Sequence, residues 1–154
     1  MVNAISSFLL YWEYVMSELN DIIEAFSSAD YQETLEMLID YSESLPELPE
    51  RFVQARDEGL NRVHECETPV FIWVEVNSGK VDIFADVPPE SPTVRGLVSI
   101  LVSAFDGLST KEVLDAPVDL LSQLGLAQKL GIRRVRGLSA VYSRIKDEVK
   151  KNIN

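Results

Sequence analysis

The stretch that most constrains the fold is residues 69–85, a short strand-like segment with helical sequence on both sides. Residues 69–76 are rich in β-branched and aromatic side chains, and residues 81–85 resemble them. Between the two, Asn77-Ser78-Gly79-Lys80 predicts a tight hairpin turn. We therefore expect one α+β domain over residues 1–154, in which N-terminal helices precede a small antiparallel sheet and C-terminal helices pack on it.

Helical periodicity dominates the N-terminal part. Apolar residues recur at spacings of three and four over residues 2–28. Asp30, followed three residues later by Glu33, predicts a capping box for a second helix that ends near Pro46. Residues 46–62 are expected to form a polar loop with a helical turn at 50–56. The second helix should turn these side chains inward: Leu35, Leu38, Ile39 and Tyr41.

After the hairpin, prolines at 88, 89 and 92 predict an extended connection. The pattern predicts a helix from Thr93 until Gly107 stops it, and Ser109 with Glu112 predicts a second capping box. A short helix over 117–124, a loop or single turn over 126–131 and a final helix over 133–150 complete the expected order.

Composition narrows the functional classes. The net charge of −11 disfavours nucleic acids and anionic membranes as partners, since both attract Lys and Arg. The apolar run near the N-terminus lacks a basic region and a cleavage site, and it is too short to span a bilayer. A single cysteine cannot form an internal disulfide, which indicates a reducing, cytoplasmic setting.

Cys66 is the strongest candidate for chemistry. A lone cysteine is most often a small buried hydrophobe, but this one lies between Glu65 and Glu67, just ahead of a strand. Two adjacent carboxylates should raise the thiol pKa by repelling the thiolate. The local sequence therefore indicates a thiol whose reactivity is completed by a partner.

Neighbouring residues leave alternatives open. His64 would share a face with Cys66 on an extended segment, although a solvated histidine is an equal alternative. The residues from His64 to Glu67 are too contiguous to close around one metal ion, so no metal site is expected. Arginines at 133, 134 and 136 oppose the dipole at a helix N-terminus, so an anion, a carboxylate or Cys66 itself could be their partner.

Four motifs, from about Met37 to Ile145, resemble a known family. The first is a Leu-Pro-x-Leu helix end, here Leu45-Pro46-Glu47-Leu48, and the second is a cysteine followed by a hydroxyl residue and Val before a strand, here Cys66 with Thr68 and Val70. The third is a Val-Arg-Gly-Leu helix start, here Val94-Arg95-Gly96-Leu97, and the fourth is an arginine followed by Gly-Leu, here Arg134 with Gly137 and Leu138. In this order they resemble the SufE family, sulfur acceptors that partner cysteine desulfurases in iron–sulfur cluster assembly. Residues 1–18 lie outside the resemblance and are expected to add a helix.

The resemblance implies a SufE-like fold and a role for Cys66 as persulfide carrier from a pyridoxal-phosphate desulfurase to a cluster scaffold. The pyridoxal phosphate belongs to the partner, so no cofactor is expected here. The family glycine before the cysteine is replaced by Glu65, and its serine by Thr68. The resemblance implies that Glu90 and Arg134 support the cysteine loop or the docking surface, and His64, Thr68 and Arg95 are further candidates for these roles.

Two other functions remain open at this stage. The chain could be a docking module that stimulates a desulfurase without carrying sulfur, or a redox-sensing thiol protein. The acidic neighbours of Cys66 argue against the second, since a sensor needs a stabilised thiolate.

Overall fold

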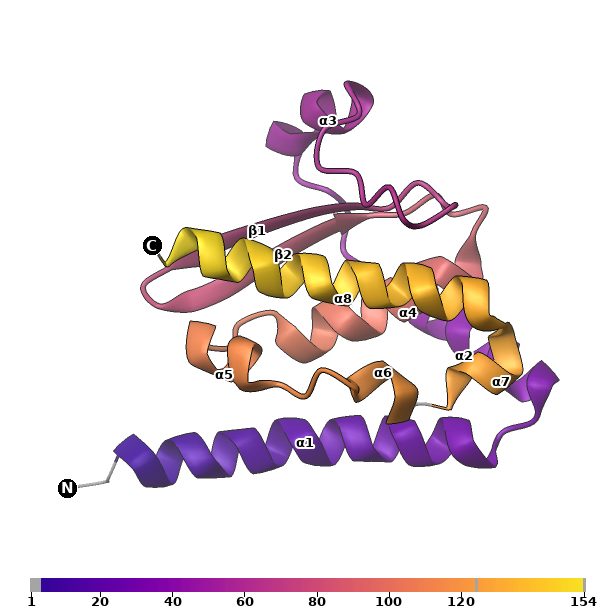
Figure 1. Ribbon diagram of the computed structural model, residues 1–154, viewed down its shortest axis with the longest axis horizontal. Helices are drawn as coiled ribbons and strands as arrows, with labels where there is room; N and C mark the ends of the chain where they lie inside the picture. Colours follow the sequence, from indigo (N-terminus) through magenta and orange to yellow (C-terminus); the bar gives the residue numbers. More distant parts are fainter. Residues whose placement is uncertain (1–3, 124, 154) are drawn as a thin grey trace.

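The computed structural model describes residues 4–123 and 125–153, which form helices around one antiparallel hairpin (Figure 1). This order confirms the predicted α+β class. The elements are α1 (Ala4–Ser28), α2 (Tyr31–Glu43), α3 (Glu50–Asp57), β1 (Phe71–Asn77), β2 (Lys80–Asp86), α4 (Pro92–Phe105), α5 (Thr110–Asp115), α6 (Leu120–Gln123), α7 (Leu126–Leu130) and α8 (Ile132–Asn152).

The hairpin is closed by the turn that its sequence predicts. Asn77 pairs with Lys80, and both residues between them have positive φ, 54° at Ser78 and 76° at Gly79. Positive φ at both central positions is the type I′ geometry, whose twist matches that of the strands. β1 begins at Phe71, two residues later than predicted, because Val70 closes the preceding loop with its backbone.

Each face of the hairpin has its own cover. On the inner face the side chains of Ile72, Val74, Ile83 and Ala85 are buried, and α8 runs along β1 (Figure 1). On the outer face Phe52 of α3 lies 5.0 Å from Trp73 and 5.1 Å from Phe84, centroid to centroid. The residues just before the cysteine segment are thus anchored on one side of the sheet, while α8 covers the other.

The α2–α4 pair packs closely because one residue has no side chain. A Cβ on Gly96 would overlap the carbonyl oxygen of Leu38. The buried stripe of α2 is Thr34, Leu38 and Ser42, and both hydroxyls donate to carbonyls of the preceding turn. The inward placement predicted for Ile39 is wrong, since it is 44% exposed. Thr34 and Ser42 are small, and their hydroxyls already have hydrogen-bond partners in the preceding turn. They therefore let the backbone of α4 approach α2 more closely than the branched side chain of Ile39 would.

Local signals fix most helix ends. Both predicted capping boxes are present, at Asp30 with Glu33 and at Ser109 with Glu112. Residues 50–57 form a full helix, where one turn was expected, and residues 126–130 form one turn of helix. The predicted helix start at residue 2 and the predicted end of the short helix at Leu124 lie outside the described residues.

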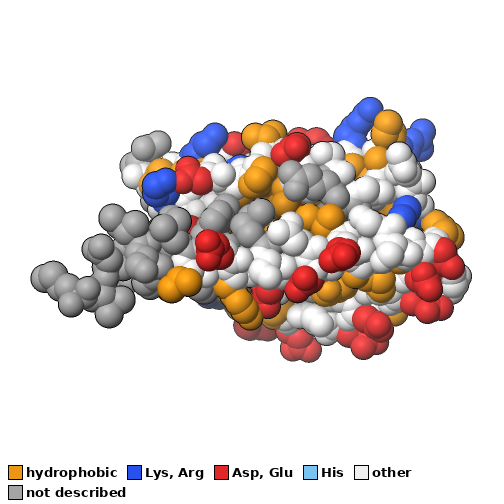
Figure 2. Space-filling view, turned by 90° about the horizontal axis from the view of Figure 1, so that it is seen from below, with side chains coloured by type: hydrophobic (Ala, Val, Ile, Leu, Met, Phe, Trp, Pro, Cys, Tyr) orange, Lys and Arg blue, Asp and Glu red, His pale blue; other side chains and the backbone are white. Residues whose placement is uncertain are grey.

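The surface reflects the negative charge of the chain. From the side of α1, Figure 2 shows acidic side chains across this face with hydrophobic ones among them, while Lys and Arg lie mainly toward one edge. Within the described ranges, none of the helices is both long enough and apolar enough to cross a bilayer.

Candidate functional site

The candidate cysteine lies in the loop that leads into β1, at the end of the strand opposite the hairpin turn. Residues 63–70, here called the cysteine loop, are closed at the base by the N–H of Val63, which donates to the carbonyl of Val70 at 2.8 Å. One residue further out, Arg62 forms an isolated antiparallel bridge with Phe71. The loop is therefore tied by backbone hydrogen bonds at its two ends, and Cys66 occupies its tip.

Cys66 turns inward from that tip. Its N–H donates to the carbonyl of Val63 at 3.2 Å, and the residue is only 7% exposed. The thiol lies against α8 at Gly137, where an added Cβ would be 3.1 Å from Sγ and 3.3 Å from the Cα of Cys66. The thiol thus belongs to the core, although both of its sequence neighbours, Glu65 and Glu67, are exposed.

Burial raises the pKa of the Cys66 thiol above its usual value. Glu67 acts in the same direction as the least of the contributing causes, while a hydrogen bond from the Thr68 backbone and the charge of Arg62 lower the pKa. The direction is the one predicted from the acidic neighbours, but the main cause is desolvation. The resting site therefore favours the neutral thiol.

His64 does not pair with Cys66. The chain turns between Val63 and Cys66, so the two side chains do not share a face as they would on an extended segment. His64 is exposed, whereas Cys66 is buried. The structure therefore supports the alternative in which His64 is a solvent-exposed side chain. Across residues 4–123 and 125–153, no group of three or more His, Cys, Asp and Glu side chains is placed to hold a metal ion.

The arginine cluster at the start of α8 faces the loop through one member. Arg133 lies 3.8 Å from Glu67, nitrogen to oxygen, and both side chains are more than four-fifths exposed at 86% and 84%. Arg134 and Arg136 are exposed on the same turns. Glu67 of the loop is therefore one carboxylate partner of this cluster. At this exposure the pair contributes at most about 1 kcal/mol.

Of the remaining candidates, Arg95 lies in α4, Glu90 lies just before it, and Thr68 lies in the cysteine loop. Arg95 uses its guanidinium to bind three backbone carbonyls, those of Ser42, Val87 and Leu45. Glu90 is exposed in the connection between β2 and α4. Thr68 is half-buried and acts on the thiol through its backbone.

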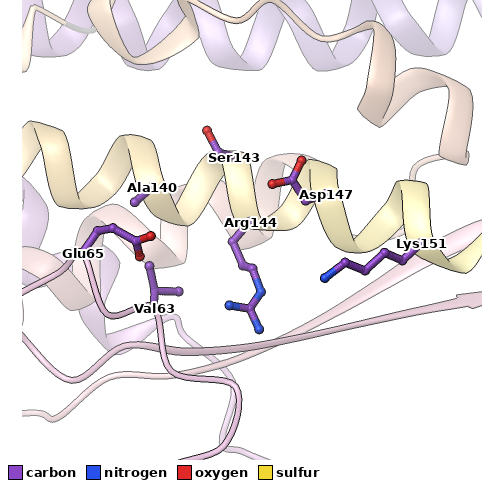
Figure 3. A pocket seen from close by; sticks show the side chains of 7 residues that line it. All are labelled: Val63, Glu65, Ala140, Ser143, Arg144, Asp147 and Lys151. Atoms are coloured by element: carbon purple, nitrogen blue, oxygen red, sulfur yellow. The ribbon is translucent and has the colours of Figure 1, made fainter.

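An open groove of about 700 Å³ borders the cysteine loop. In Figure 3, Val63 and Glu65 reach it from the loop, while Arg144 extends from α8 toward the strands. Its charges are of both signs, and Arg144 is paired with Glu148 at 3.0 Å. The groove is lined by Val63, Glu65, Ala140, Ser143, Arg144, Asp147 and Lys151, so the thiol itself is not part of it.

Sequence reasoning missed two features of the site. It did not anticipate that Gly137 touches Cys66, although a glycine inside a helical pattern is a signal of close approach. It also did not connect Arg62 with the thiol. Among the described residues, Nε of Arg62 is the one buried side-chain nitrogen or oxygen without a hydrogen-bond partner.

Comparison with known proteins places these features in a family. Residues 20–149 match the family described as SufE, Fe-S metabolism associated domain. An uncharacterized SufE-like protein of Mycobacterium tuberculosis is 31% identical over 133 residues, which are 86% of this chain and 91% of that protein. The sulfur acceptor protein CsdE of Escherichia coli is 30% identical over 118 residues, 75% of this chain and 76% of CsdE.

The fold has a solved counterpart as well. The solution structure of a hypothetical protein from Thermus thermophilus superposes with a TM-score of 0.73 at 32% sequence identity. The match covers 88% of this chain and 95% of that one. The similarity therefore extends over nearly the whole of both chains.

Proposed function

The chain belongs to the SufE family, and from this premise we propose that Cys66 accepts sulfur from a cysteine desulfurase and carries it as a persulfide to an iron–sulfur cluster scaffold. The name of the E. coli relative, a sulfur acceptor protein, supports the general role. The choice of residue rests on this chain, because Cys66 is its only cysteine and lies within the matched residues.

The observation that carries the proposal is the position of the thiol. Cys66 is at the tip of a loop tied at its base, and both of its neighbours in sequence face solvent. A thiol buried deep inside an element could not reach a partner without unfolding that element. Here the loop tip can turn outward while the base hydrogen bond between Val63 and Val70 is kept.

The transfer is a displacement at sulfur. The thiolate of Cys66 attacks the terminal sulfur of the persulfide on the desulfurase, and a new S–S bond forms as the old one breaks. The cysteine of the desulfurase leaves as a thiolate, so the sulfur oxidation level is conserved and no external oxidant is required. The pyridoxal phosphate that generates the persulfide belongs to the desulfurase.

The resting site protects the thiol and does not activate it. A neutral thiol on a residue that is only 7% exposed is a poor nucleophile, since the thiolate is the reactive form. The loop must open, and positive charge in the partner's site would then favour the thiolate. The free thiol that this mechanism needs fits a reducing, cytoplasmic setting.

We assign the docking role chiefly to Arg134, which is exposed in the first turn of α8. His64 and Glu90, also exposed, are secondary candidates for contact with the partner. Thr68 supports the cysteine through its backbone hydrogen bond. Glu65, in place of the family glycine, lines the groove in Figure 3.

The test uses the whole chain, a cognate desulfurase and L-cysteine labelled with radioactive sulfur, without reductant. Wild-type protein should acquire label that dithiothreitol releases. Cys66→Ser should acquire none, and Ser139→Ala, an exposed change on α8, should label like wild type. Equal labelling of Cys66→Ser and wild type would refute the proposal.

A second function is favoured by the exposed arginines of α8: the protein could stimulate the desulfurase by docking alone. In that case Cys66→Ser would keep the stimulation of alanine production from L-cysteine, and Arg134→Glu would lose it. A carrier instead loses stimulation with either substitution. The two variants together therefore separate carrier from docking module.

A further inference from the structure

Two of the seven glycines in this chain are placed where their backbone conformation does not require glycine. Five have positive φ and occupy turns or helix ends. The other two, Gly96 and Gly137, lie inside α4 and α8. Glycine destabilises a helix interior relative to alanine, so each of these positions needs another reason.

In both helices that reason is a close neighbour. A Cβ on Gly96 would overlap the backbone of Leu38 in α2, and a Cβ on Gly137 would meet Cys66. At position 137 the distances are 3.1 Å to Sγ, 3.3 Å to Cα and 3.4 Å to Cβ of Cys66. The first two are tighter than ordinary van der Waals contacts, so either the thiol or the loop would have to move.

The two neighbours differ in how they can respond. Leu38 is fixed in a hydrogen-bonded helix and is fully buried there. Cys66 is at a loop tip whose adjoining residues, Glu65 and Glu67, face solvent. A methyl group at position 137 would therefore displace the cysteine loop before it displaced α8, which packs along β1.

We propose that Gly137 is a positioning residue for Cys66: the missing side chain at this point of α8 is what lets the thiol rest in the core, and the size of residue 137 determines how readily the thiol is exposed. The consequence for sulfur transfer rests on the proposed function of Cys66. The statement about thiol exposure stands on the geometry alone.

The first experiment measures thiol exposure without any partner. The full chain and its Gly137→Ala variant are treated with an aromatic disulfide that releases a coloured thiolate. Overpacking a close contact shifts the balance between packed and open loop, so Gly137→Ala should react at least about tenfold faster. The pH midpoint of its reaction should also fall toward that of free cysteine, a change that loss of packing elsewhere in α8 would not produce.

Ser139→Ala is the matched control, since it changes an exposed residue two positions away on the same helix. It should react at the wild-type rate. A folded Gly137→Ala protein with the wild-type rate and pH midpoint would overturn the proposal.

The second experiment remains informative if Gly137→Ala folds poorly. The urea midpoint is measured for Gly137→Ala in the wild-type and Cys66→Ala backgrounds. Removing Sγ eliminates the closest contact, so Gly137→Ala should lower the midpoint in the wild-type background and lower it much less, or raise it, with Cys66→Ala. Equal changes in both backgrounds would show that position 137 and the thiol are independent, and would overturn the proposal.

The outcomes also separate this inference from the proposed function. If Cys66→Ser still acquires radioactive sulfur, the carrier function fails while the effect of position 137 on the thiol can still hold. If Cys66→Ser acquires none but Gly137→Ala leaves thiol reactivity unchanged, only the role of Gly137 fails.

Discussion

Arg95 provides a quantitative test of whether a motif residue acts in docking or in the fold. In the first turn of α4, its Nε donates to the carbonyl of Ser42 at 3.0 Å and its Nη1 to that of Val87 at 2.6 Å. A third contact, from Nη2 to the carbonyl of Leu45, is 3.5 Å long. One side chain thus joins the end of α2, the chain that follows it and the exit from β2.

The expected loss follows from these contacts. A hydrogen bond from a charged donor contributes about 1.5–3 kcal/mol, and a contact as long as the third adds little. Two good bonds at a half-buried site therefore place Arg95→Ala about 3 kcal/mol below wild type in free energy of unfolding. That is a large share of a typical stability of about 5–15 kcal/mol, and it corresponds to a fall in Tm of about 6–12 °C.

The assay is urea unfolding followed by circular dichroism. Arg95→Lys should recover only part of the loss, because a single ammonium cannot reproduce the planar fork of the guanidinium. Arg134→Ala, an exposed change, should stay within about 0.5 kcal/mol of wild type. The reasoning is refuted if Arg95→Ala loses less than about 1 kcal/mol while desulfurase stimulation falls, since Arg95 would then be a docking residue.

Three further predictions concern the fold and the thiol. Gly96→Ala should destabilise the protein by about 1–3 kcal/mol in urea unfolding, because the added Cβ overlaps the Leu38 carbonyl. This loss should exceed the gain in helix propensity, and a more stable variant would contradict the α2–α4 packing. Asp30→Ala should lose about 1 kcal/mol in the same assay with the capping box of α2, and an unchanged urea midpoint would contradict the cap. The Cys66 thiol should react with iodoacetamide with a pH midpoint above the ordinary value of about 8.5, and urea should restore that value. Because its pKa is raised in the folded state, its contribution to stability is fully present below about pH 8.5 and is lost as pH rises through the folded pKa. Cys66→Ala should remove that pH dependence.

Much of the fold was predictable because its signals are local. The type I′ turn at Ser78-Gly79 depends on two residues that tolerate positive φ, and the capping boxes depend on pairs three residues apart. The spacing of apolar residues likewise predicted the long helices. Ile39 was misplaced because its inward or outward direction depends on how closely α4 approaches, and Gly96, far away in the sequence, sets that distance.

The candidate site, like the fold, was predictable only where its features depend on local sequence. From the sequence alone, Cys66 could be selected as the one thiol, placed in a loop before a strand and assigned a raised pKa, because these depend on residue identity and near neighbours. Its burial and its contact with Gly137 depend on the packing of α8 along β1 beside the loop, whereas its separation from His64 follows from the turn between Val63 and Cys66. Desolvation depends on atoms brought together from distant parts of the chain, and it outweighs the charge of the adjacent glutamate.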